Sequence, residues 1–68
     1  MKELIFLIEE AEEGGYLAKA VGEAIFTEGE TLEEVKANIK EAVTCHFEEE
    51  SLPRFVRLHI VKDELLLL

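Results

Sequence analysis

The sequence contains almost no cysteine, proline or tryptophan. Its 68 residues include one cysteine, one proline and no tryptophan. One cysteine cannot form a disulfide within the chain or a zinc site built from several thiolates. A chain of this length forms one domain at most, and its core is worth only ~3–5 kcal/mol without covalent help. We therefore expect a single domain over residues 1–68, stabilised by dense packing or by self-association.

Long hydrophobic runs are also absent. No apolar stretch approaches the roughly 20 residues that a membrane-spanning helix needs, and no secretory signal pattern opens the chain. Hydrophobic residues nevertheless make up 49% of the sequence, which excludes a disordered chain. With a lone free cysteine and no signal, the sequence predicts a cytoplasmic protein without a membrane partner.

Basic residues are scarce. Seven lysines and arginines face sixteen aspartates and glutamates, which gives a net charge of −9. Such a surface repels phosphate backbones, so we expect no direct nucleic-acid binding. The charge favours basic partners, and the alternative is that it serves solubility alone.

Hydrophobic periodicity and turn residues predict four strands and one helix. Strands are expected over residues 2–10, 16–21, 24–28 and 55–62. The paired glycines Gly14 and Gly15 suit a hairpin turn between the first two strands. The segment Thr31-Leu32-Glu33-Glu34 is a capping box that begins an amphipathic helix of about four to five turns, which we expect Ser51-Leu52-Pro53 to stop.

These elements predict an α+β fold, a four-stranded mixed sheet in the order 3-2-1-4 with one helix on one face. Tight turns make the first three strands an antiparallel meander, and a right-handed helical crossover returns the fourth strand beside the first. The first strand is apolar on both faces, so Ile5 and Leu7 on the uncovered face need a second cover. A partner chain would supply it.

Four consecutive leucines close the sequence and also indicate a contact with a partner chain. Exposed apolar runs of this kind are unusual on a soluble monomer. We therefore predict that Ile5, Leu7 and the tail Leu65, Leu66, Leu67 and Leu68 form oligomer contacts in a dimer or larger assembly. The alternative is that the tail only extends the fourth strand or is unstructured.

Three segments together resemble the HicB-like antitoxin domain family. They are Gly14-Gly15-Tyr16, Thr27-Glu28-Gly29-Glu30-Thr31-Leu32-Glu33-Glu34 and Asn38-Ile39-Lys40-Glu41-Ala42. The resemblance covers residues 4–61 and implies a partial ribonuclease-H-like fold, β-β-β-α-β. It also implies a stand-alone member of the HicA–HicB toxin–antitoxin group, which binds and masks a small, basic, RNA-cleaving HicA-type toxin.

Two departures from this family limit what is carried over. The segment from Val21 to Ile25 lacks the proline and cysteine that many members have before the third strand, so toxin contacts of that loop are not carried over. Full antitoxins continue into a DNA-binding domain, and we expect no such separate domain here. Operator binding is therefore not carried over.

The pattern of reactive side chains predicts that the protein is not an enzyme. Ribonuclease-H-like enzymes place an aspartate in the middle of the first strand, where this chain has Ile5-Phe6-Leu7, and its only aspartate is Asp63. Cys45 and His46 are helical neighbours and point about 100° apart, which does not suit a nucleophile and its base. We place His46 on the helix's apolar stripe and expect no catalytic residue, cofactor or metal.

Acidic clusters are the candidate partner-binding residues. Glu9, Glu10, Glu12 and Glu13 lie beside the hairpin, and Glu48, Glu49 and Glu50 follow at the expected end of the helix. Either cluster could dock a basic protein, or both could be solvated surface. Arg57 and His59 share a strand face, where pairing with glutamates of a neighbouring strand is expected. The leading hypothesis is a HicB-like antitoxin-type binding domain, and the alternative is a self-assembling accessory domain without a toxin.

Overall fold

The computed structural model describes residues 3–68, so Lys2 of the first expected strand lies outside the described residues. Its elements are β1 (Glu3–Glu10), β2 (Tyr16–Ala20), β3 (Phe26–Gly29), α1 (Leu32–His46), the short 3₁₀ helix η1 (Glu49–Ser51) and β4 (Phe55–Val61). One sheet has the order β3-β2-β1-β4, in which β1 and β4 are parallel and the other pairs antiparallel. The predicted α+β fold and strand order are confirmed.

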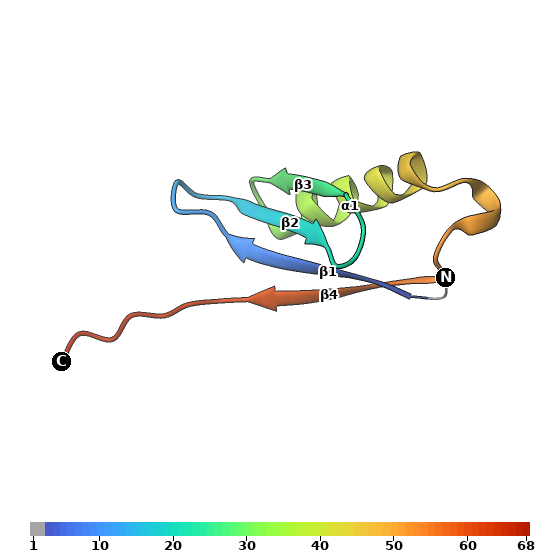
Figure 1. Ribbon diagram of the computed structural model, residues 1–68. Helices are drawn as coiled ribbons and strands as arrows, with labels where there is room; N and C mark the ends of the chain where they lie inside the picture. Colours follow the sequence, from blue (N-terminus) through green and yellow to red (C-terminus); the bar gives the residue numbers. More distant parts are fainter. Residues whose placement is uncertain (1–2) are drawn as a thin grey trace.

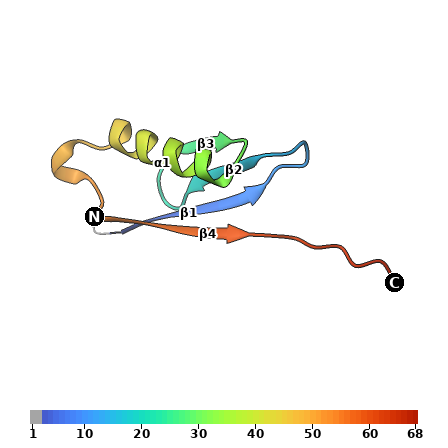
Figure 2. The ribbon, with the colours of Figure 1, turned by 180° about the vertical axis from the view of Figure 1, so that it is seen from behind.

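The helix covers only part of one face of the sheet. Figures 1 and 2 show α1 across β3 and β2, and its backbone lies closest to these two strands, while its buried side chains also share a core with β1. β4 lies at the opposite edge, where Val56 and Leu58 are only partly buried against the core. The other face of the sheet is uncovered in a single chain, as the sequence predicted.

The core lies between this helix and the central strand. Leu4, Phe6 and Ile8 alternate along β1, point toward α1 and are buried. They meet the helix stripe formed by Val35 and Ile39. The remaining buried hydrophobic residues are Val43, Ala18, Ala20 and Ile25. Every second side chain of β1 and every third or fourth side chain of α1 therefore point into one shared core.

A glycine pair forms the turn between β1 and β2. Gly14 and Gly15 have φ values of 103° and 77°, a region that residues with a side chain rarely adopt. The amide of Ala11 donates to the carbonyl of Gly15 at 3.0 Å and closes the turn. Gly15 also lies against the backbone of Gly29 at the end of β3, where an added Cβ would come within 2.8 Å of the Gly29 oxygen.

The helix begins where the capping box predicted. The Thr31 hydroxyl accepts a hydrogen bond from the Glu34 amide at 3.1 Å. The 15 residues of the helix agree with the predicted length of about four to five turns, but the helix ends at His46, before the stop expected at residues 51–53. Phe47 adopts an extended conformation, its amide donates to the Val43 carbonyl at 3.1 Å, and its partly buried side chain packs against the core. Packing of this one side chain takes precedence over local helix propensity.

Two further expectations are corrected. His46 is exposed rather than part of the buried stripe, because the helix ends there and the ring turns toward Glu23, with 3.4 Å between Nε2 and Oε1. β3 begins at Phe26 instead of Ala24, since the chain is still turning after Gly22. Neither correction changes the topology.

Candidate functional site

The most distinctive surface is a hollow of about 760 Å³ at the hairpin end of the sheet. We call it the acidic hollow, because six glutamates line it. They are Glu10, Glu12, Glu13, Glu28, Glu30 and Glu34.

The fold collects these glutamates from distant parts of the sequence. Glu10 to Glu13 lie at the end of β1 and in the turn that follows. The antiparallel register places Tyr16 opposite Gly29, so Glu28 and Glu30 on either side of Gly29 come beside the hairpin. The capping box then adds Glu34 from the first turn of α1. The same glycines that permit the close approach thus gather negative charge at one end of the molecule.

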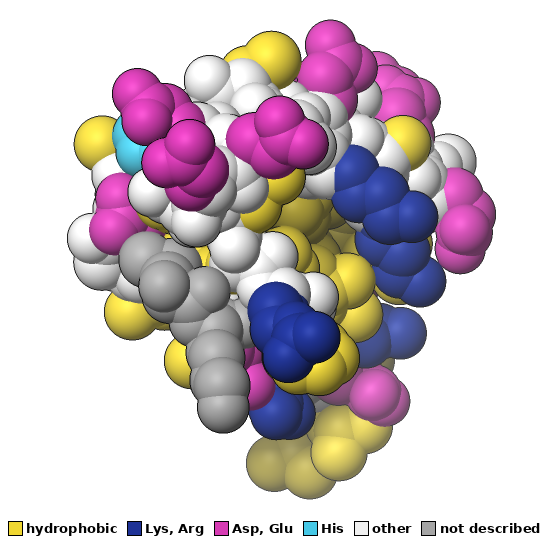
Figure 3. Space-filling view, turned by 90° about the vertical axis from the view of Figure 1, so that its right-hand side faces the viewer, with side chains coloured by type: hydrophobic (Ala, Val, Ile, Leu, Met, Phe, Trp, Pro, Cys, Tyr) yellow, Lys and Arg dark blue, Asp and Glu magenta, His cyan; other side chains and the backbone are white. Residues whose placement is uncertain are grey.

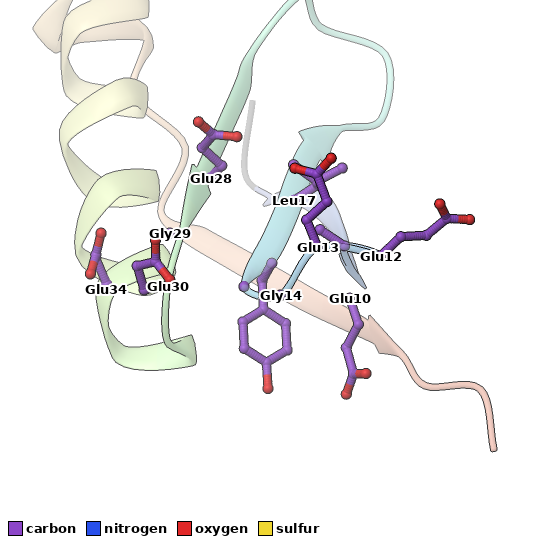
Figure 4. A pocket seen from close by; sticks show the side chains of 12 residues that line it. Glu10, Glu12, Glu13, Gly14, Leu17, Glu28, Gly29, Glu30 and Glu34 are labelled. Atoms are coloured by element: carbon purple, nitrogen blue, oxygen red, sulfur yellow. The ribbon is translucent and has the colours of Figure 1, made fainter.

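The carboxylates do not form a chelating centre. Figure 4 shows the labelled glutamate side chains pointing in different directions around the hollow. Within residues 3–68, no three His, Cys, Asp or Glu side chains lie close enough together to hold a metal ion. The hollow is therefore a broad negative surface that suits the cationic side chains of another molecule.

Comparison with known proteins identifies relatives over most of the chain. A UPF0150 protein of Thermotoga maritima is 47% identical over 62 residues, which cover 91% of this chain and 87% of the relative. A UPF0150 protein of Archaeoglobus fulgidus is 51% identical over 51 residues, which cover 75% of this chain and 76% of the relative. This chain belongs to the UPF0150 family. No family model and no solved structure matches it.

The acidic residues singled out in the sequence of this UPF0150 chain lie in three places. Glu10 lines the acidic hollow. Glu9 lies on the uncovered face of the sheet, opposite Leu17 on β2 and Val61 on β4. Glu48, Glu49 and Glu50 are exposed around η1, at the other end of the molecule (Figure 1). The structure therefore joins Glu10 to glutamates of β3 and α1, and not to the second predicted cluster.

The residues that sequence reasoning missed are Glu28, Glu30 and Glu34. Their position was implied by the predicted meander, because an antiparallel third strand must end beside the turn where the second begins. The pairing of Tyr16 with Gly29 is needed to show which glutamates of this region become neighbours. Each glutamate alone is an ordinary surface residue.

The uncovered face of the UPF0150 sheet is mixed rather than continuously apolar. Leu7 is half-buried between Lys19 and His59, and Ile5, 37% exposed, lies beside Arg57. The tail Leu65, Leu66, Leu67 and Leu68 extends past the sheet and is almost fully exposed (Figure 1). The predicted oligomer residues thus form two separate surfaces. None of the helices in residues 3–68 is long and apolar enough to cross a membrane.

The expected cross-strand ion pair forms at Arg57. Its Nε and Nη2 donate to the two carboxylate oxygens of Glu3 at 2.9 and 3.2 Å. These hydrogen bonds favour the ionised form and lower the pKa of Glu3 below its ordinary value. His59 makes no ion pair within the part of the chain that the structure describes.

This pair predicts a measurable acid dependence. Because the pKa of Glu3 is lower in the folded state, its contribution to stability is present above the ordinary glutamate pKa and is lost as the pH falls through the lowered value. We expect Glu3→Gln to reduce the loss of stability between neutral and acid pH. Urea unfolding across that range tests it, with the exposed Glu33→Gln as control. An identical pH profile for both variants would contradict the prediction.

Proposed function

We propose that this UPF0150 protein is an antitoxin-type binding domain, without catalytic activity, that masks a small basic toxin of the HicA class. The observation that carries the proposal is the acidic hollow. Its six glutamates come from β1, the hairpin, β3 and α1, and these elements hold them in one fixed arrangement.

The net charge of the whole chain, like the acidic hollow, attracts a basic partner. A net charge of −9 on 68 residues produces an attractive field for a basic protein and speeds its approach. A fixed cluster at one end then orients the encounter, because complementary charge contributes to specificity and association rate more than to raw affinity. Such binding weakens as salt screens the charges.

The residues that resemble the HicB-like family lie at this same hollow. Gly14, Gly15 and Tyr16 line one side of it. The second segment, Thr27 to Glu34, contributes Glu28, Gly29, Glu30 and Glu34 to the other side. Two of the three segments on which the resemblance depends are thus neighbours in space, which supports a shared binding role for them.

Calorimetric titration against the HicA-type toxin of the same genome tests the proposal. We expect complex formation at low salt and a dissociation constant that rises with salt. The triple variant Glu28→Gln, Glu30→Gln, Glu34→Gln removes three charges from the hollow and is expected to weaken binding at least tenfold, about 1.4 kcal/mol.

The matched control removes the same charge at the other end of the molecule. Glu48→Gln, Glu49→Gln, Glu50→Gln changes the net charge equally around η1 and is expected to alter the dissociation constant less than threefold, about 0.6 kcal/mol. Equal weakening by the two variants would show that net charge alone carries the binding. Absence of binding at low salt would remove the proposal.

A second candidate function is a self-assembling accessory domain without a toxin partner. The exposed leucine tail and the partly apolar uncovered face favour it. Light scattering distinguishes it from a monomeric antitoxin. A strict monomer at micromolar concentration, unchanged when residues 65–68 are removed, would contradict this candidate.

A further inference from the structure

The two edges of the sheet are protected to different degrees. β3 is four residues long, is packed beside α1, and has its Glu28 carbonyl bound by the Asn38 side chain at 2.7 Å. β4 is seven residues long, and its outer side pairs with no strand in residues 3–68. A long unpaired edge is a template for another strand. β4 is therefore the edge at which this sheet can grow.

Hydrophobic side chains are exposed along this edge and in the chain that follows it. Phe55 and Ile60 of β4 are 64% and 46% exposed. Residues 62–68 continue from β4 as a segment without secondary structure that runs beyond the sheet (Figure 1). Four of those seven residues are the exposed leucines. Residues 62–68 are thus as many as the residues of β4, follow directly after its open edge, and end in four leucines.

A groove beside β4, on the helix side of the sheet, carries lysines, whereas the tail carries acidic residues before its leucines. Ile39, Val56 and Leu58 line it, together with Lys40, Lys36 and Glu33, whose carboxylate lies 3.7 Å from the Lys36 ammonium. Figure 3 shows Lys and Arg side chains around a hollow with hydrophobic side chains at its base. Two lysines against one glutamate are a local excess of positive charge in a chain with only seven basic residues. The tail carries Asp63 and Glu64 immediately before its leucines.

We propose that two copies of this chain pair through β4, antiparallel about a two-fold axis, so that residues 62–68 of each copy extend along the β4 edge of the other. The side chains of opposed residues must lie on the same face of the joined sheet. With Val61 on the axis, His59 lies opposite Asp63 of the second copy, and Phe55 lies opposite its Leu67. The seven tail residues then cover the edge from residue 54 to residue 60.

This register matches both the apolar and the charged groups. Leu66 of the second copy lies opposite Val56 and covers the groove. Glu64 of the second copy lies opposite Leu58, on the face of the sheet where Lys36 and Lys40 line the groove. The paired sheets form one eight-stranded sheet in which no β4 edge remains open. The contact is the same on both copies, so the assembly closes at two.

The dimer gives the second candidate function a defined interface and does not depend on the toxin proposal. The acidic hollow is lined by residues of β1, the hairpin, β2, β3 and α1, none of which belongs to β4 or the tail. Loss of the dimer therefore leaves toxin binding measurable, and loss of toxin binding leaves the dimer measurable.

Sedimentation analysis of matched phenylalanine variants tests the interface. Phe55 on β4 and Phe26 on β3 are each 64% exposed, and they lie at opposite edges of the sheet. We expect a wild-type dimer, and we expect Phe55→Glu and Leu66→Glu each to raise its dissociation constant at least tenfold, because each change occurs twice in the interface. Phe26→Glu is expected to leave the dimer unchanged. Far-UV circular dichroism confirms that each variant is folded.

Cross-linking tests the register. In a Cys45→Ser background, Val61→Cys places two thiols across the axis, where opposed Cα atoms are about 4.5–5.5 Å apart and a disulfide can form. We expect a covalent dimer on mild oxidation, and none from Phe26→Cys in the same background. A monomeric wild-type protein, failure of Val61→Cys to cross-link, or dissociation by Phe26→Glu in place of Phe55→Glu would each overturn the proposal. In the last case the protein still assembles, but through the uncovered face.

Discussion

Phe6→Ala is expected to leave most of the protein unfolded at 25 °C. Phe6 lies in the middle of β1, between Ala20 of β2 and Leu58 of β4, and is fully buried beneath the helix. Truncating a buried phenylalanine costs ~3–5 kcal/mol, because hydrophobic burial is lost and a cavity remains. A domain of this size has a total stability of about that amount. One substitution therefore removes nearly all of it.

Urea unfolding followed by circular dichroism measures this effect. The control is Phe26→Ala, the same chemical change at a side chain that is 64% exposed, with an expected cost below about 1 kcal/mol. If Phe6→Ala is too unstable to give a baseline, Phe6→Leu keeps most of the volume and is expected to cost about 1.5 kcal/mol. All variants are compared at one protein concentration, because self-association adds to stability. Equal losses at the two phenylalanine positions would show that the core is elsewhere.

Gly15→Ala is expected to cost about 2–4 kcal/mol, the second largest effect of a single substitution. Two costs combine. An alanine at a φ of 77° is strained by ~1–2 kcal/mol, and its Cβ would come within 2.8 Å of the Gly29 carbonyl oxygen. That oxygen belongs to the backbone at the end of β3, so relief requires the hairpin and β3 to move apart.

Gly14→Ala separates these two costs. Gly14 has a φ of 103°, and a Cβ there meets no atom within 4 Å. We expect Gly14→Ala to cost ~1–2 kcal/mol from backbone strain alone. The difference between the two variants, measured by urea unfolding, then reports the contact between the hairpin and β3. Equal values would mean that this contact relaxes without cost.

The topology could be predicted from the sequence because local features agreed with one another. The paired glycines 14 and 15, the capping box at Thr31 and the period of two in β4 each set one element, and the short connections allowed one arrangement of them. The alternation of buried residues in β1 was less clear in the sequence, since Ile5 and Leu7 are apolar as well. The sequence nevertheless placed Ile5 and Leu7 on the uncovered face, and the burial of Leu4, Phe6 and Ile8 on the helix side agrees with that assignment.

The remaining features depend on contacts that local patterns do not encode. The end of α1 at His46 results from the packing of Phe47 against the core. The acidic hollow requires the register that sets Tyr16 opposite Gly29, which brings together glutamates that are separated in the sequence. Sequence composition predicted a negatively charged surface, and the fold determined where that charge gathers.

The parallel pairing of β1 with β4 has a consequence for synthesis of the chain. Glu3 pairs with Phe55 and Glu9 with Val61, so β1 is translated about 50 residues before β4, its neighbour on one side. On the ribosome, β1, β2 and β3 can meet early, while one side of β1 stays without its neighbour until translation reaches β4. Such distant pairing slows folding and makes it cooperative. Until β4 has been made, β1 is therefore the edge of a three-stranded sheet, and one of its sides stays unpaired.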